Sequence, residues 1–330
     1  DVDLVEEVAR MEGYDELPSA VPSVAPHEIS SAQYDVENAI ARTLASLGYD
    51  EIVSLSLNDG YFDRAVRAGL APSRRPVAVL NPISEDHRYL RHSLTPGLLE
   101  YFARLDAPAR AFEIGHIFAQ DDNHINESPG ASFAFAAEPI DEPEWRDSNF
   151  LRIKGDCEAF LRAMTGQTAT ASPDERNGLH PGKTATMMIG GREVAFLGKI
   201  DPRLQRAFDV RLPVYICVVY LDSLPDRHAR RYVAPSRFPS TYRDLALVVG
   251  TDVAAADLEQ SVARALGEMC TGVRAFDEYR GPQVPDGKKS LALRATLARF
   301  DATITDEEAD GAVERALAVV REELGATIRA

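Results

Sequence analysis

The clearest strand in the sequence reads Leu291-Ala292-Leu293-Arg294-Ala295-Thr296-Leu297-Ala298. Its larger apolar side chains occupy every second position, and Arg294 lies between two of them. Successive side chains of a strand point to opposite faces of a sheet. The alternation therefore predicts a strand with one face packed against helices and the other, with Arg294, facing outward.

The flanking sequence predicts the rest of one small domain. Thr305 and Glu308 are spaced as a capping box, which marks the start of a helix. In chain order the pattern predicts a strand at 245–249, a helix with Leu258, Val262 and Leu266 on one face, a strand at 273–279, a helix with Val313, Leu317, Val320 and Leu324 on one face, and a strand at 326–329. The order β-α-β-β-α-β is that of a ferredoxin-like sandwich.

The preceding residues predict a larger domain that mixes helices and strands, so the fold class is α+β. Helices are expected at 31–48, with Val36, Ile40, Leu44 and Leu47 buried, at 92–105 with Pro96 in the first turn, and at 150–164. Strands are expected at 52–57, 77–80, 111–119, 133–137 and 214–221, with a hairpin of 184–189 and 193–198 that turns at Gly190-Gly191. The polar residues 121–130 are expected to form a loop.

Residues 1–18 predict an amphipathic helix that Gly13 ends. We therefore divide the chain at 1–18, 19–232 and 233–330. The first residues, Asp1-Val2-Asp3, carry neither an initiator Met nor a signal peptide, and we expect the sequence to be part of a longer chain. No run approaches the roughly 20 apolar residues that a membrane helix needs.

Composition narrows the choice of function. Three widely spaced cysteines favour a reducing cytoplasm, and no spacing of Cys or His suggests a metal site. The net charge is −16, and residues 235–330 carry 12 Lys and Arg against 16 Asp and Glu, a net of −4. Phosphate contacts need Lys and Arg, so a general nucleic-acid binder is disfavoured, and any RNA contact must use a local cluster.

Short motifs in the tail carry a family resemblance. They read Ser236-Arg237-Phe238-Pro239, Tyr242-Arg243-Asp244-Leu245, Phe276-Asp277-Glu278-Tyr279-Arg280-Gly281 and Gly287-Lys288-Lys289-Ser290. Together they resemble the ferredoxin-fold anticodon-binding domain at the C-terminal end of the β subunit of bacterial phenylalanine–tRNA ligase. The resemblance implies that the tail contacts the anticodon stem and loop of tRNA-Phe.

The middle region resembles the catalytic-like module of the same β subunits. Its motifs are Asn81-Pro82-Ile83-Ser84, Tyr89-Leu90-Arg91-His92-Ser93-Leu94-Thr95-Pro96-Gly97, Phe112-Glu113-Ile114-Gly115, Leu179-His180-Pro181-Gly182-Lys183 and Gly198-Lys199-Ile200-Asp201-Pro202. Such a module resembles a class II synthetase domain, an antiparallel sheet that has lost its chemistry. The resemblance implies that it packs against a catalytic α subunit, which binds ATP, in an α2β2 tetramer.

Two features of this module could suggest chemistry. Arg110 and Glu113 echo the Arg-x-x-Glu of class II motif 2, but no Gly-rich motif 3 is present, so we favour surface or interface roles for both and name no catalytic residue. His180, in a His-Pro-Gly turn, is expected to bond a neighbouring carbonyl group rather than a ligand.

The acidic residues Asp3, Glu6 and Glu7 allow two interpretations. Acids in the first turn stabilise a helix, and the residues alone favour that role. The surrounding sequence, however, resembles the end of the family's B5 domain. There the matching acids and an earlier Asp bind Mg²⁺ shared with the α subunit. That earlier Asp would lie before residue 1, so we expect an incomplete site.

The tail offers six candidate tRNA-binding residues: Arg237, Arg243, Arg280, Lys288, Lys289 and Arg294. Phe238, Phe276 and Tyr279 could stack on bases, or could lie in the core. The leading hypothesis is a β-subunit segment of phenylalanine–tRNA ligase that scaffolds the α subunit and contacts tRNA, inactive alone. A free-standing RNA-binding module and an active class II adenylate-forming enzyme remain the alternatives.

Overall fold

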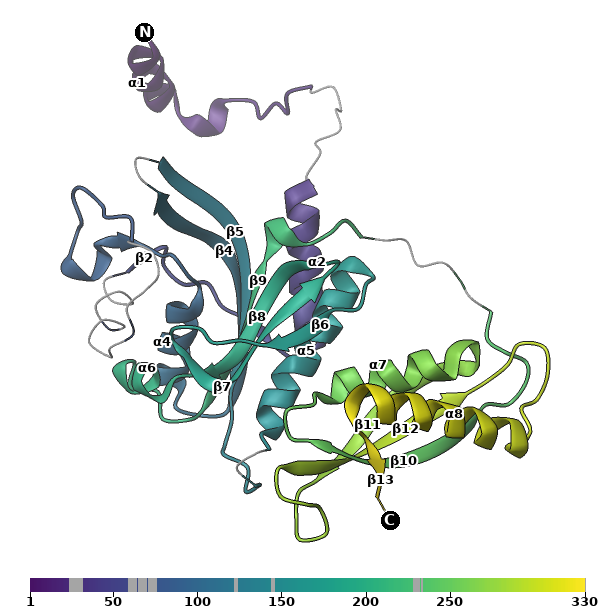
Figure 1. Cartoon of the computed structure of the whole chain (residues 1–330). Helices are drawn as coiled ribbons and strands as arrows, with labels where there is room; N and C mark the ends of the chain where they lie inside the picture. The colour runs from purple at the N-terminus through teal and green to yellow at the C-terminus, as the bar shows by residue number, and fades with distance from the viewer. Residues whose placement is uncertain are drawn as a thin grey trace. The chain divides into compact units, whose positions relative to one another are not determined.

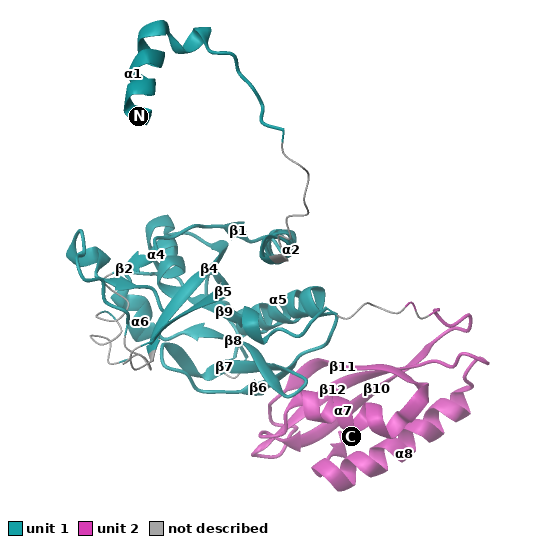
Figure 2. Cartoon of the chain, turned by 90° about the horizontal axis from the view of Figure 1, so that it is seen from above, with its two compact units in different colours: residues 1–230 teal, residues 231–330 magenta. Residues whose placement is uncertain are grey.

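The computed structural model describes residues 1–23, 32–58, 64, 70, 76–121, 124–143, 146–227, 232 and 234–329. These residues form two compact units, 1–230 and 231–330, each with its own sheet (Figures 1 and 2). We call the second one the tail unit. The predicted α+β class is confirmed, with an antiparallel-dominated sheet in the first unit and a ferredoxin-like sandwich in the second.

The first unit is built on a seven-stranded sheet of order β1-β4-β5-β9-β8-β7-β6. All neighbours in it are antiparallel except β1 and β4, which are parallel. The strands are β1 (Asp50–Glu51), β4 (Ala109–Asp121), β5 (His124–Ala136), β6 (Thr170–Pro173), β7 (Leu179–Ile189), β8 (Arg192–Ile200) and β9 (Val214–Tyr220). The helices are α1 (Val2–Glu12), α2 (Ala32–Ser46), α4 (Thr95–Leu105), α5 (Ser148–Thr165) and α6 (Pro202–Ala207).

The two faces of this sheet are covered unequally. On one face Phe112, Phe133 and Cys217 pack with side chains of α2 and α5 into a continuous core. On the other face α4 and α6 cover one end, where Ala111, Ala134 and Ile216 are buried. Strand register places Glu113, Ser132, Val218 and Phe196 in the next row of that face, and Gly115, Gly130 and Tyr220 in the row after it. These further rows line the hollow described below.

A second, small sheet pairs β2 (Leu57–Asn58) with β3 (Tyr89–Leu90), and a short 3₁₀ turn at Glu85–His87 precedes β3. The predicted strand at 52–57 is wrong, because the Ser54 N–H and hydroxyl bond to the Glu113 carboxylate and take the backbone away from a ladder. The predicted strand at 77–80 is reduced to a bridge between Ala78 and Tyr89. Leu80 beyond it is 97% exposed.

Three further expectations are corrected. The polar residues 124–130 are not a loop, because they lie in β5 and pair with β4 as the exposed arm of a long hairpin; residues 122–123 lie outside the described residues. The helix predicted from His92 begins at Thr95, since the Ser93 hydroxyl accepts the Thr95 N–H. Val36, expected to be buried, is exposed, because only the part of α2 with Ile40 and Leu44 reaches the core.

The tail unit has the predicted order, with a sheet β11-β12-β10-β13. Its elements are β10 (Thr241–Gly250), α7 (Ala255–Leu266), β11 (Cys270–Tyr279), β12 (Lys288–Leu297), α8 (Asp306–Leu324) and β13 (Thr327–Ile328). Both helices pack on one face of the sheet, against Leu245, Leu247, Leu291 and Leu293. The capping box of Thr305 and Glu308 is confirmed.

Helix α1 is confirmed and ends at Gly13, but its apolar residues Leu4, Val5 and Val8 are all more than half exposed. Among the described residues, no helix combines the length and the apolar character that crossing a membrane requires.

Candidate functional site

The face of the tail sheet that α7 and α8 leave uncovered carries a stacked cation. The Arg294 guanidinium lies 4.4 Å from the ring centroid of Tyr242 and 5.5 Å from that of Phe276. Asp244, on the neighbouring strand, accepts hydrogen bonds of 2.8 and 2.7 Å from Arg294 Nε and Nη2 and so holds the guanidinium beside the two rings. Tyr242 and Phe276 are 57% and 56% exposed, so both rings can receive a further flat group.

We call this surface the open face and define it by Tyr242, Asp244, Arg274, Phe276 and Arg294. Strand register places Arg274 directly opposite Arg294. Like charges at directly opposed positions of a sheet repel each other. Arg294 is paired with Asp244, whereas Arg274 is exposed and has no carboxylate partner among the described residues, so Arg274 is the cation suited to an anion.

The six candidate tRNA-binding residues do not share one surface. Arg294 and Lys288 belong to the uncovered side of β12. Arg243 belongs to the opposite side, where its Nε and Nη2 donate to Asp310 and Asp306 of α8 at 2.6 and 2.7 Å. Lys289 shares that helix-covered side with Leu291 and is 7% exposed. Two of these cations thus lie on the same side of the sheet, six residues apart in β12, and two others lie on the opposite side.

The last two candidates lie outside the ladder. Arg237 is exposed in the segment before β10, and Arg280 follows β11 with its Nε 2.7 Å from a carboxylate oxygen of Glu278. Of the aromatic candidates, Phe276 is exposed, whereas Phe238 and Tyr279 are half-buried. The sequence prediction overlooked Arg274 and Tyr242. The alternation of β10 and β11 would have placed both beside Arg294.

The acidic residues Asp3, Glu6 and Glu7 lie on the exposed helix α1. Their spacing puts them on one side of the helix, and carboxylate oxygens are ligands that Mg²⁺ accepts. Glu7 pairs with Arg10. In the ranges that the structure describes, no three His, Cys, Asp or Glu side chains gather in a way that could hold a metal ion. The three acids alone therefore do not make a metal site, and their ligand role stays a prediction.

Arg110 and Glu113 point to opposite faces of the large sheet, since they are three residues apart in β4. The Arg110 guanidinium lies 4.3 Å from the Tyr49 ring centroid and pairs with Asp156. Glu113 is 1% exposed on the other side of the sheet. The expected surface or interface role is therefore wrong for Glu113, whereas for Arg110, with a side chain that is 22% exposed, it stays a prediction. The two side chains also cannot meet at one substrate as a motif 2 pair would.

Glu113 is the centre of a buried polar cluster. Its carboxylate accepts hydrogen bonds from Arg91 Nη1 at 2.5 Å and from the Ser54 N–H and hydroxyl at 3.0 and 2.9 Å. Arg91 Nε also donates to the His116 carbonyl at 2.8 Å. Two glycines make room for this cluster, because a Cβ at Gly115 would lie 2.1 Å from Arg91 Nη2 and one at Gly97 would lie 2.4 Å from Ser54 Oγ. The cluster fixes residues 54 and 91 to β4.

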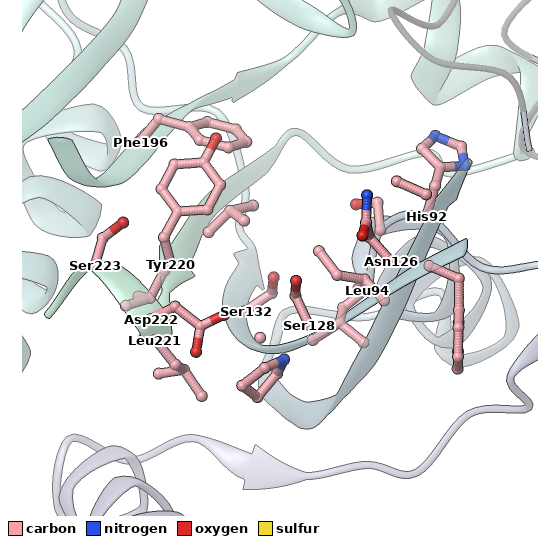
Figure 3. Close-up of a pocket in the computed structure, with 18 of the residues that line it drawn as sticks. His92, Leu94, Asn126, Ser128, Ser132, Phe196, Tyr220, Leu221, Asp222 and Ser223 are labelled. Atoms are coloured by element: carbon pink, nitrogen blue, oxygen red, sulfur yellow. The ribbon is translucent and has the colours of Figure 1, made fainter. Parts of the chain in front are cut away.

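Next to this cluster, the large sheet carries a hollow of 680 Å³ (Figure 3). Ser128, Gly130 and Ser132 of β5 line it, together with Tyr220, Phe196 and the residues 221–223 that follow β9. Its walls include Leu94 and His92, and burial lowers the pKa of His92 to about 4. The imidazole is therefore uncharged at neutral pH.

His180 has the structural role expected of it, since its Nδ1–H donates to the carbonyl group of Pro181 at 2.5 Å. The nearby Lys183 ammonium donates to Asp147 at 2.7 Å. Asp147 also caps α5 by accepting the Phe150 N–H at 2.9 Å. The contacts of His180 and of Lys183 are thus structural, and they hold the start of β7 in place.

Comparison with known proteins agrees with the two-unit structure. Residues 17–221 match the family model described as "Phenylalanyl tRNA synthetase beta chain CLM domain", and residues 236–329 match "Ferredoxin-fold anticodon binding domain". The chain is 33% identical to the phenylalanine–tRNA ligase β subunit of Methylococcus capsulatus over 100% of its own length and 42% of that protein. It is 32% identical to that of Bacillus cereus over 99% of its length and 42% of the relative.

The chain thus spans about two fifths of the length of these curated relatives. Among solved structures, a pyrrolysyl-tRNA synthetase from Desulfitobacterium hafniense matches with a TM-score of 0.46 and 21% identity, over 58% of this chain and 67% of that one. That likeness is too low to support a fold or function assignment.

Proposed function

The chain belongs to the phenylalanine–tRNA ligase β-subunit family, and on that basis we propose that it is part of the enzyme that attaches phenylalanine to tRNA-Phe with ATP. In this proposal the catalytic α subunit, in a cytoplasmic α2β2 assembly, binds ATP and performs the chemistry. The segment described here supports the α subunit and contacts the tRNA. We expect it to hold no complete active site of its own. The family matches over both units do not favour an active adenylate-forming enzyme or a free-standing RNA-binding module.

The observation that carries the RNA contact is the Tyr242–Arg294–Phe276 stack on the open face. Single-stranded bases bind proteins mainly by stacking on aromatic rings and guanidinium planes. The net charge of the tail unit is negative, so a long-range electrostatic field cannot supply the affinity. Stacking needs no such field, and Arg274 would supply a local phosphate contact.

A second surface suits the proposed α-subunit contact. Four apolar side chains of the segments around the small sheet are largely exposed: Val53 at 90%, Leu55 at 69%, Leu80 at 97% and Ile83 at 95%. Both segments adjoin the same ladder, because residues 56–58 and 77–79 bond to residues 88–91. Several exposed apolar side chains on two neighbouring segments favour a surface that contacts a protein partner.

The proposed Mg²⁺ shared with the α subunit would take ligands from α1. Among the described residues no ion pair holds Asp3 or Glu6, whereas Glu7 would have to leave Arg10. Further ligands would have to complete the site, since the described residues supply no group of three.

The test of the proposed function is binding of an anticodon stem-loop of tRNA-Phe, measured by fluorescence anisotropy. Replacing both Tyr242 and Phe276 by Ala should weaken binding by about 2–4 kcal/mol, since each stacked base contributes roughly 1–3 kcal/mol. Tyr34→Ala removes an equally exposed ring from the first unit and should leave the affinity unchanged. Equal affinity of the double variant and the unchanged chain would refute the role of the open face.

The α-subunit contact needs a separate measurement. Light scattering of the chain mixed with its cognate α subunit should give the mass of a complex. Replacing Leu80 and Ile83 by Ser should lower the fraction of complex while the RNA affinity stays the same. No complex with the unchanged chain would remove the scaffold role from the proposal.

A further inference from the structure

The hollow on the large sheet ends in an unsatisfied polar group. Ser132 is 1% exposed, and its hydroxyl has no hydrogen-bond partner among the described residues. A buried hydroxyl without a partner costs about 1–3 kcal/mol, so it marks a place where a hydrogen-bonding group fits. Leu94, Val218 and Phe196 contribute apolar side chains to the lining.

The lining of the hollow also includes a carboxylate. Asp222 and Ser223 follow β9 and line the hollow beyond Tyr220, whose register partner in β5 is Gly130 (Figure 3). The Asp222 side chain is exposed, and no cation pairs with it in the described part of the chain. An ammonium group that enters the hollow can therefore approach a carboxylate that is not already neutralised.

Among the described residues, the lining offers no unpaired cation to an anionic ligand. The lining includes the guanidinium of Arg176, but its Nε already donates to Asp174 and its Nη2 to Glu193, both at 2.6 Å. The same side chain lies 4.3 Å from the Phe196 ring centroid and donates to the Tyr220 hydroxyl at 3.2 Å. The His92 imidazole is neutral. Within the described part of the lining, phosphates and carboxylates thus find no available positive partner.

From this arrangement we propose that the hollow binds a small organic cation with an apolar body and one hydrogen-bonding group. The hydrogen-bonding group would meet the Ser132 hydroxyl, the body would lie over Gly130 among the apolar walls, and the ammonium would face Asp222. A volume of 680 Å³ is within the range of roughly 300–1,000 Å³ that is usual for small-molecule sites. This site is independent of the proposed tRNA contact.

Three related compounds test the proposal by isothermal titration calorimetry on the 330-residue chain. Tyramine has both the ammonium and a hydroxyl group, 2-phenylethylamine lacks the hydroxyl group, and 3-(4-hydroxyphenyl)propionate replaces the ammonium by a carboxylate. We expect tyramine to bind about fivefold more tightly than 2-phenylethylamine and at least about tenfold more tightly than the propionate. No saturable binding of tyramine, or tighter binding of the propionate, would overturn the proposal.

Two variants locate the contacts. Asp222→Asn should abolish the preference for tyramine over the propionate, whereas Asp226→Asn, a nearby exposed carboxylate outside the lining, should keep it. Ser132→Ala should abolish the preference for tyramine over 2-phenylethylamine and leave the affinity for the latter unchanged. The variant removes an unsatisfied hydroxyl, so its unfolding temperature should not fall. Preferences that survive both variants would place any binding elsewhere and refute the site.

Discussion

In both sheets of this chain helices cover one face, and the two sheets differ in what covers the other face. In the tail unit that face is left flat, and Tyr242, Arg294 and Phe276 stack in the open. In the first unit α4 and α6 cover one end of the face and leave a hollow beyond it. The same alternation of strand residues therefore makes a stacking surface in one unit and a concave pocket in the other, according to what covers it.

An Arg–carboxylate pair occurs on both of these faces, once buried and once exposed. The pair of Arg91 and Glu113 in the first unit has side chains that are 7% and 1% exposed, and that of Arg294 and Asp244 in the tail has 49% and 41%. Breaking a buried pair leaves an uncompensated charge in the interior, whereas water replaces the partner of an exposed one.

The largest expected effect follows from this contrast. Glu113→Gln should lower the free energy of unfolding by about 3–5 kcal/mol, and Asp244→Asn by about 1 kcal/mol or less. Urea denaturation followed by circular dichroism would measure both, with the transition of each unit fitted separately. Equal losses in the two variants would mean that burial does not distinguish the pairs.

A pair of glycines offers the next test within the first unit. Gly115 and Gly130 are register partners in β4 and β5. A Cβ at Gly115 would lie 2.1 Å from Arg91 Nη2, whereas one at Gly130 would meet its neighbours at 3.7 Å or more. Gly115→Ala should therefore destabilise by roughly 1–3 kcal/mol, while Gly130→Ala should be close to neutral. Thermal unfolding of the two variants decides this, and a neutral Gly115→Ala would show that the cluster can move aside.

The wall of the hollow should give stability a pH dependence. Burial lowers the pKa of His92 to about 4, from an ordinary value of 6.5. The unfolded chain therefore binds a proton that the folded chain does not, so stability is complete above pH 6.5 and declines as the pH falls from 6.5 towards 4. The loss should be on the order of 1–2 kcal/mol, allowing for partial exposure of the ring.

The measurement compares the chain with its His92→Gln variant between pH 7 and 5. The free energy of unfolding of the unchanged chain should fall relative to that of the variant as the pH falls, because the variant has no imidazole to protonate. A difference that stays constant over this range would show that His92 titrates normally.

The sequence predicted the features that depend on local contacts and missed those that depend on contacts between distant parts of the chain. The ferredoxin-like tail followed from local signals, such as the alternation of β12 and the capping box of Thr305, and it was confirmed. The hollow did not follow, because it arises where Ser132, Tyr220 and Asp222 come together from separate parts of the chain. The polar arm of β5 was mistaken for a loop, since pairing with β4, rather than its own composition, makes it a strand.

The candidate RNA surface was predicted in part for the same reason. Lys and Arg near the motifs were taken together, although Arg243 and Lys289 belong to the helix-covered side. The sequence does contain a signal that separates them, because alternate residues of a strand point to opposite faces of the sheet. It would have retained Arg294, removed Lys289 and added Arg274.

The smallest expected effect sharpens the account of the open face. Arg274 is exposed, has no carboxylate partner among the described residues and lies opposite Arg294, so a phosphate placed there would relieve the repulsion between the two. Arg274→Ala should weaken binding of the anticodon stem-loop by about 1 kcal/mol and reduce the slope of log K against log salt by about 0.7, as expected for one phosphate contact on a single strand. Arg315→Ala, an exposed arginine of α8 on the other side of the tail unit, should change neither quantity. Because stacking is almost insensitive to salt, an unchanged slope with weaker binding would assign Arg274 to the bases rather than to the backbone of the RNA.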